Sequence, residues 1–137
     1  MYTKIMVPVD LAHIQRIEKA LLTAADLAKH YDATVCYVGV TPETPSEVAH
    51  NPQEFAEKLK AFGQEQAKQH GLTAESLSRL GHDPAIDLAD TLLKAIDEIG
   101  ADLVVMASHV PGFPDHFFSS NAGWVASHAR ISVFVIR

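Results

Sequence analysis

The chain has 137 residues, of which 47% are hydrophobic and 20% charged, and no apolar run approaches the length of a membrane-spanning helix. It has 11 Lys and Arg against 17 Asp and Glu, and this net charge of −6 argues against binding to nucleic acid. The one cysteine, Cys36, lies in an apolar run, which favours a buried thiol in a reducing compartment. We therefore expect a cytoplasmic protein with one domain over residues 1–137, and with neither a membrane nor a nucleic acid as partner.

Five short segments rich in valine and isoleucine alternate with amphipathic segments, which is typical of a parallel sheet covered by helices on both faces. The predicted strands are Lys4 to Val9, Thr34 to Val40, Ala74 to Leu80, Asp102 to Ser108 and Ser132 to Arg137. The third strand alternates polar and apolar residues, so we expect it at an edge of the sheet. The predicted fold class is α/β, a doubly wound and Rossmann-like sheet with the strand order 3-2-1-4-5.

Four helices are expected between these strands. An apolar stripe at steps of three and four predicts the first, and its members are Ile14, Ile17, Leu21, Ala24 and Ala28. The second begins after the N-cap Asn51, ends at Gly71, and has the apolar stripe Phe55, Leu59 and Phe62. The third begins after Asp83, ends at Gly100, and has the apolar stripe Ile86, Ala89, Leu93 and Ile96. The fourth is short, from Ser119 or Ser120 to about Ala129, and the segment from Thr41 to Asn51 is expected to be a loop.

Ligands of doubly wound sheets bind at the carboxyl ends of the strands, where the strand order reverses. Here that crevice is expected between the first and fourth strands, which end at Pro8-Val9-Asp10 and Ala107-Ser108-His109. Neither a Walker A motif nor a G-x-G-x-x-G motif occurs, which excludes the two commonest phosphate loops. Asp10 has two compatible interpretations, as an acceptor for a ribose or an adenine amino group or as an N-cap for the next helix.

The stretch after the fourth strand carries most of the remaining candidate chemistry. Ser119, Ser120 and Asn121 stand at the start of the last helix, where free N–H groups and hydroxyls can hold a phosphate. The alternative is that Ser119 or Ser120 only caps this helix. His109, Asp115 and His116 share the loop, but their spacing is weak for a metal site, and we expect none. Three aromatic residues around the loop are expected in the core by default, with a lid or a partner surface as alternatives: Phe117, Phe118 and Trp124.

Efficient catalysis is not expected from these residues. Ser108 and His109 do not form a nucleophile–base pair, because neighbours at the end of a strand point to opposite faces. The sequence also lacks the G-x-S-x-G motif of a nucleophile elbow. We expect slow hydrolysis of a bound nucleotide at most.

These segments together resemble the universal stress protein family over essentially the whole chain. The matching segments are Ile5 to Asp10, Gly81 to Ala85, Ala101 to His109, Ser120 to Ala122, His128-Ala129 and Val133 to Ile136. The later part is similar to the F/G-type branch, in which Ala-Ser-His-x-Pro is followed by Gly-Ser-Asn-Ala. The resemblance implies an adenine nucleotide α-hydrolase-like fold and a homodimer formed by the final strands. The interface residues would be Ser132, Val133, Phe134, Val135 and Ile136.

The resemblance also implies an adenine nucleotide as ligand, either ATP or AMP, with Mg²⁺ if the ligand is ATP. The positions that would contact it are Pro8, Val9, Asp10, Val38, Gly39, Val40, Ala107, Ser108, His109, Val110, Ser119, Ser120 and Asn121. The family pattern has glycine at the positions of Ala107, Val110 and Ser119, and a Cβ at Ser119 narrows the approach of a phosphate. We therefore expect adenine and ribose recognition to be better preserved than phosphate recognition.

Two alternatives remain beside this hypothesis. A family member that has lost its nucleotide would act through contacts with a protein partner, which the sequence does not name. The missing glycines and the pair Phe117-Phe118 favour that interpretation. An enzyme of the wider adenine nucleotide α-hydrolase-like group is less well supported, because the chain reads Asp10-Leu-Ala-His13 where such enzymes have a Ser-Gly-Gly-x-Asp-Ser loop.

Overall fold

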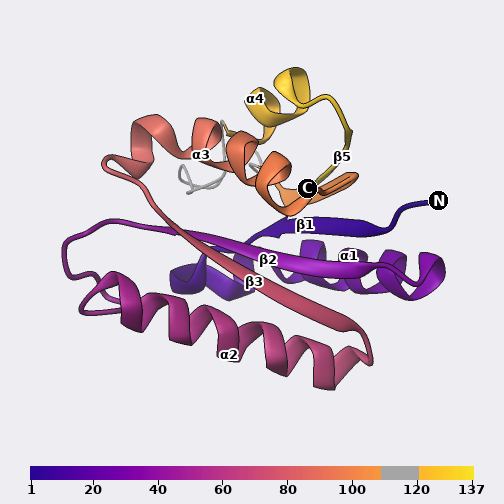
Figure 1. The fold of residues 1–137 in the computed structure, drawn as a ribbon, viewed down its shortest axis with the longest axis horizontal. Helices are drawn as coiled ribbons and strands as arrows, with labels where there is room; N and C mark the ends of the chain where they lie inside the picture. The colour runs from indigo at the N-terminus through magenta and orange to yellow at the C-terminus, as the bar shows by residue number, and fades with distance from the viewer. Residues whose placement is uncertain (109–120) are drawn as a thin grey trace.

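A parallel sheet with helices on both faces forms the computed structural model, which describes residues 1–108 and 121–137 (Figure 1). Its strands lie in the order β3-β2-β1-β4-β5, as predicted. The strands are β1 (Lys4–Pro8), β2 (Thr34–Thr41), β3 (Thr73–Leu80), β4 (Leu103–Ala107) and β5 (Ser132–Ile136). Each strand agrees with its predicted range to within one residue at either end. The alternating strand β3 lies at an edge of the sheet, as expected.

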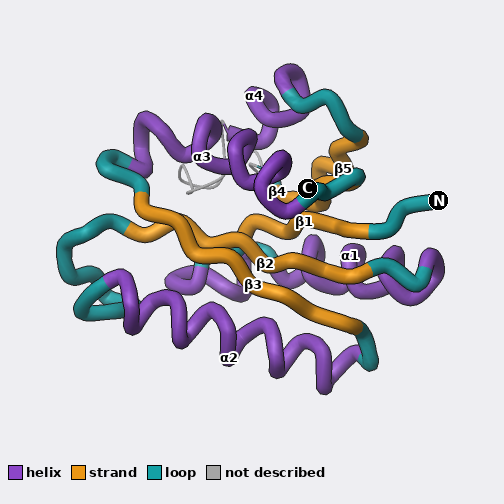
Figure 2. The backbone as a smooth tube through the Cα atoms, in the orientation of Figure 1, coloured by secondary structure: helices purple, strands orange, loops and turns teal. Residues whose placement is uncertain are grey.

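The helices are α1 (Glu18–Tyr31), α2 (Pro52–His70), α3 (Pro84–Ile99) and α4 (Asn121–His128), with a 3-10 helix η1 (Leu11–Arg16) before α1. Helices α1 and α2 cover one face of the sheet, and α3 and α4 cover the other (Figure 1). A long loop joins β2 to α2, as predicted, and it runs at the same end of the sheet as η1 (Figure 2). Among the described residues, no helix is both long and apolar enough to cross a membrane.

The second helix follows its predicted caps. The side chain of Asn51 accepts a hydrogen bond from the backbone N–H of Glu54 at 2.8 Å, and Pro52 occupies the first turn. Gly71 ends the helix with φ of 67°, in the left-handed region where a glycine carries no steric penalty. Phe55 and Leu59 of its stripe are buried against the sheet.

The predicted start of the first helix is wrong. Ile14 belongs to η1, because the Asp10 carboxylate accepts a hydrogen bond from the backbone N–H of Ala12 at 3.1 Å and begins a tighter turn. The backbone leaves helical geometry at His13, with φ of −138° and ψ of 53°, so α1 begins only at Glu18. The rest of the stripe is buried as predicted, namely Ile17, Leu21, Ala24 and Ala28.

The core face of α3 is broader than its predicted stripe. Ala89 and Ile96 are buried, but Leu93 is only partly buried. Leu88, Leu92 and Ala95 complete the buried face, because α3 packs against both β2 and α4 and needs apolar contacts toward each. The side chain of Ile86 and the predicted starts of the fourth helix at Ser119 or Ser120 lie outside the described residues.

Cys36 lies in the core, 1% exposed. Burial raises the pKa of its thiol to about 11, with the Glu75 carboxylate adding to the rise. The thiol therefore stays protonated at neutral pH, as expected for an unreactive core cysteine.

Helix α2 packs tightly against β2 at Gly39. A Cβ at this position would lie 2.8 Å from two carbons of the Phe55 ring and 3.1 Å from a methyl carbon of Leu59. Because glycine has no side chain, α2 can pack closely against the sheet at this position. The predicted contact of Gly39 with a nucleotide stays a prediction, and in this structure Gly39 leaves room for the Phe55 ring.

We expect Gly39→Ala to lower the free energy of unfolding by about 1–3 kcal/mol, because the added methyl overpacks the contact with Phe55. Denaturant unfolding would measure the change. Gly123→Ala is the matched control, since among the described residues no heavy atom outside its own stretch of α4 lies within 4 Å of a Cβ built there. This control should be neutral or stabilising by up to about 1 kcal/mol, because alanine favours a helix. Equal stability of Gly39→Ala and the parent protein would contradict the close packing.

Candidate functional site

A cavity of about 200 Å³ lies at the carboxyl ends of β1 and β2. Its walls come from the end of β1 with η1, from the end of β2, from the loop between β2 and α2, and from the first turns of α2. The lining residues are Val9, Asp10, Leu11, Ala12, His13, Val40, Thr41, Pro42, Ser46, Glu47, Val48 and Phe55. A second, more open cavity of about 400 Å³ adjoins it and shares four of these residues, Leu11, Ala12, Glu47 and Val48.

Most of the described cavity wall is apolar. Val9, Val40 and Phe55 form the buried part. Among the described residues that line it, none is Lys or Arg, whereas Asp10 and Glu47 supply carboxylates. Such a site suits a flat, uncharged ring better than a phosphate.

Asp10 and His13 form a pair at the edge of this cavity. Asp10 Oδ2 lies 2.8 Å from His13 Nδ1, and Asp10 Oδ1 accepts from the backbone N–H of Ala12. The backbone N–H of His13 also donates to the carbonyl oxygen of Asp10 at 3.1 Å. The capping interpretation of Asp10 is thereby confirmed. The side chain of Asp10 is 12% exposed and that of His13 is 40% exposed, so His13 is the more exposed member of the pair.

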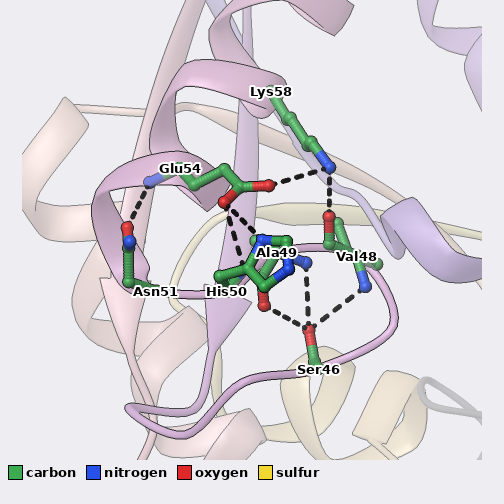
Figure 3. A network of polar contacts seen from close by, with 7 residues as sticks. All are labelled: Ser46, Val48, Ala49, His50, Asn51, Glu54 and Lys58. Atoms are coloured by element: carbon green, nitrogen blue, oxygen red, sulfur yellow. Dashed lines mark hydrogen bonds and ion pairs between the residues drawn. The ribbon is translucent and has the colours of Figure 1, made fainter.

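Hydrogen bonds to Ser46 stabilise the loop that forms one wall of the cavity. Ser46 Oγ accepts hydrogen bonds from the backbone N–H groups of Val48 and Ala49, each at 3.3 Å (Figure 3). The backbone N–H of Ser46 donates to the carbonyl oxygen of Ala49 at 2.9 Å. This compact turn places Val48 against the cavity.

Glu54 anchors the same loop to α2 (Figure 3). One carboxylate oxygen lies 2.9 Å from His50 Nδ1, and the other lies 3.2 Å from Lys58 Nζ, which also donates to the carbonyl oxygen of Val48. Hydrogen bonds from the side chain and the backbone of His50, and then from Lys58, lower the pKa of Glu54 to about 2. The carboxylate therefore remains charged, and the loop anchored, well below neutral pH.

Three of the predicted nucleotide contacts line the cavity, namely Val9, Asp10 and Val40. Pro8, Val38 and Gly39 lie deeper in β1 and β2 and are buried. Ala107, Ser108 and Asn121 are at the ends of β4 and α4 and do not line it. The other four, His109, Val110, Ser119 and Ser120, lie outside the described residues.

The described cavity lies between β1 and β2, one strand away from the crevice expected between β1 and β4. Nine of its residues were not predicted: Leu11, Ala12, His13, Thr41, Pro42, Ser46, Glu47, Val48 and Phe55. Only their place in the sequence could have indicated these residues. The loop from Thr41 to Asn51 follows β2, which pairs with β1, so the loop begins at the carboxyl end of a strand beside β1. Within the described ranges, no group of His, Cys, Asp and Glu is arranged to hold a metal, and His109, Asp115 and His116 fall outside them.

The predicted interface strand β5 forms the second edge of the sheet. Phe134 is 46% exposed, Val133 and Val135 are half-buried, and Ile136 is buried within its own chain. Trp124, expected in the core by default, is 49% exposed and stacks on His128 with ring centroids 3.9 Å apart. The core prediction for Trp124 is therefore wrong, because the buried face of α4 is formed by Ala122 and Val125 and does not include Trp124. Phe117 and Phe118 lie outside the described residues.

The fold and the cavity define a doubly wound α/β protein with a cavity at the carboxyl ends of its central strands. The profile of the Universal stress protein family matches residues 1–137. Universal stress protein G of Salmonella typhimurium is 30% identical over 148 residues, which cover 100% of both chains. The chain belongs to the universal stress protein family, and this relative agrees with the resemblance to the F/G-type branch.

Solved structures share the fold. A universal stress protein from Burkholderia pseudomallei has a TM-score of 0.71 and 25% identity, covering 98% of this chain and 96% of that one. The universal stress protein from Archaeoglobus fulgidus in complex with dAMP has a TM-score of 0.70 and 22% identity, covering 99% of this chain and 98% of that one.

We expect Glu54→Ala to speed up hydrogen exchange at the amides of Val48, Ala49 and His50, because the loop loses its anchor to α2. Exchange followed by mass spectrometry would measure this, with exchange in β1 unchanged. Glu57→Ala is the matched control, since Glu57 is an exposed residue on the same helix outside the Glu54 network. Unchanged exchange in Glu54→Ala would show that the carboxylate does not hold the loop.

Proposed function

We propose that this protein is a small cytoplasmic stress-response module that binds an adenine nucleotide, with residues 1–137 as its one domain. The observation that carries the proposal is the cavity between the ends of β1 and β2, whose apolar walls fit a planar base. It includes Asp10, the acidic residue that the family resemblance assigns to the nucleotide. The dAMP complex of the Archaeoglobus fulgidus structure, which has the same fold, supports the same ligand class.

The charge of the site favours a ligand with few phosphates. Asp10 and Glu47 place negative charge at the cavity, and Lys58 is already paired with Glu54. The sequence also has Ala107, Val110 and Ser119 where the family pattern has glycines. We therefore expect AMP to bind at least as tightly as ATP, with Mg²⁺ relevant only to ATP, and hydrolysis to be slow at most.

Calorimetric titration of the folded, nucleotide-free protein with AMP and ATP, each with and without Mg²⁺, tests this function. Micromolar binding of AMP, about −8 kcal/mol, is the expected result. Ala12→Met should weaken it about tenfold or more, because the longer side chain fills the cavity that Ala12 lines. Ala126→Met, on an exposed position of α4, is the matched control. No binding by the parent protein would remove the proposed function.

A family member without a nucleotide, acting through a protein partner, is the second candidate. The missing family glycines favour it. Ser119→Gly separates the two, because removal of the Cβ should strengthen ATP binding if the rest of the site is intact. No binding by either the parent protein or the glycine variant would favour the second candidate.

We also propose a homodimer formed through β5. This strand is an edge of the sheet, where unpaired backbone N–H and C=O groups can pair with a strand of a second copy. Beside it lies a groove of about 400 Å³. Its lining residues are Tyr2, Leu27, Tyr31, Leu103, Ser132, Val133, Phe134 and Val135.

Val135→Asp should convert the dimer into a monomer, because the carboxylate would have to be buried in the interface. Light scattering at tens of micromolar would measure the mass. Leu80→Asp is the matched control, since Leu80 is 46% exposed on β3 at the opposite edge. A monomeric parent protein at this concentration would contradict pairing through β5.

A further inference from the structure

Few polar side-chain atoms of the cavity remain available for a ligand. Thr41 Oγ1 donates to the carbonyl oxygen of Pro42 at 3.3 Å, and Ser46 Oγ is occupied by its two backbone donors. Both carboxylate oxygens of Asp10 already accept hydrogen bonds, and its side chain is mostly covered. Within the described part of the wall, the side-chain polar atoms without a hydrogen bond are His13 Nε2 and the carboxylate oxygens of Glu47.

The contact with Asp10 determines which nitrogen of His13 can meet a ligand. An ionised carboxylate only accepts hydrogen bonds, so at a separation of 2.8 Å the proton must sit on His13 Nδ1. In the neutral ring, Nε2 is then a bare acceptor. No hydrogen bond to Nε2 is present among the described residues, and 40% of the side chain is exposed.

The backbone holds this ring in place. His13 has non-helical dihedral angles within η1, and its N–H donates to the carbonyl oxygen of Asp10. The residue is thus fixed at both its backbone and its ring by one aspartate. Glu47, by contrast, is an exposed residue of the loop, and its carboxylate has no comparable support among the described residues.

We propose that His13 Nε2 is the hydrogen-bond acceptor that this cavity presents to its ligand, with Asp10 as the residue that positions it. This inference rests on the proposed function, and it assigns selectivity for a nucleotide that carries a hydrogen-bond donor on its base or sugar. The exocyclic amine of adenine and the ribose hydroxyls are the donors of an adenine nucleotide. In this role Asp10 acts on the ligand through the His13 ring, which it orients.

Two substitutions distinguish the role of His13 Nδ1 from the role of His13 Nε2. His13→Asn keeps a donor near the position of Nδ1 and loses the acceptor, whereas His13→Gln places its amide oxygen near the position of Nε2. We expect His13→Asn to bind AMP about tenfold more weakly and His13→Gln to stay within about threefold of the parent protein. Thermal unfolding of His13→Asn should match that of the parent, since the contact with Asp10 is kept. Equal binding by His13→Asn and the parent protein would overturn the inference, as would equal losses in both variants.

Ligand analogues identify the donor. The analogues are purine riboside monophosphate, which lacks the amine, and the 2′-deoxy and 3′-deoxy forms of AMP. One of them should bind the parent protein about tenfold more weakly than AMP, and His13→Asn should not distinguish that analogue from AMP. Retained discrimination in His13→Asn would assign the contact to another group, such as Glu47, and reject His13. Binding of AMP by the parent with no effect at His13 removes this inference alone, whereas absence of AMP binding removes the proposed function together with it.

Discussion

Burial of β1 between β2 and β4 is the constraint on which the rest of the structure depends. Ile5, Met6 and Val7 are fully buried. Where the chain enters and leaves this buried strand, its backbone N–H and C=O groups therefore need hydrogen-bond partners. At one end of the strand, Asp102 accepts from the backbone N–H groups of Thr3 and Lys4. Burial acts to raise the pKa of Asp102, but these hydrogen bonds outweigh it and hold the pKa below its usual range. At the other end, the Asp10 carboxylate accepts a hydrogen bond from the backbone N–H of Ala12 in η1.

The cavity at the ends of β1 and β2 follows from this arrangement. Because Asp10 begins a tight turn, η1 stays at the end of the sheet, and the loop after β2 lies beside it. The hydrogen bonds of Ser46 and the ion pair of Glu54 with Lys58 hold that loop in the conformation that forms the cavity wall. Phe55 belongs to both the core and the cavity wall, since it rests on Gly39 and also lines the site. The size of the cavity is therefore coupled to the packing of α2 on the sheet.

The sequence predicted those features that depend on local patterns. Alternation in residues 74–80 identified an edge strand, and Asn51 and Gly71 located the ends of α2, because these signals act within a few residues. The first helix was placed too early, because Asp10 favours a 3-10 turn over an immediate helix. Most of the cavity wall was missed, since the contact of Glu54 with His50 and Lys58 forms only once loop and helix are folded together. Asp10 was recognised, but its partner His13 was not, because nothing in its spacing distinguishes it from a surface histidine.

Because Cys36 is buried in the core, its reaction with a thiol reagent can report transient opening of the core. It is the one cysteine of the chain, it lies in the strand beside β1, and its protonated thiol is shielded from solvent. A thiol reagent can reach it only when the sheet separates, so the rate of labelling counts openings of the core and not fluctuations of the surface. A ligand that closes the cavity and holds β1, β2 and α2 together would slow that labelling without any change to the residue itself.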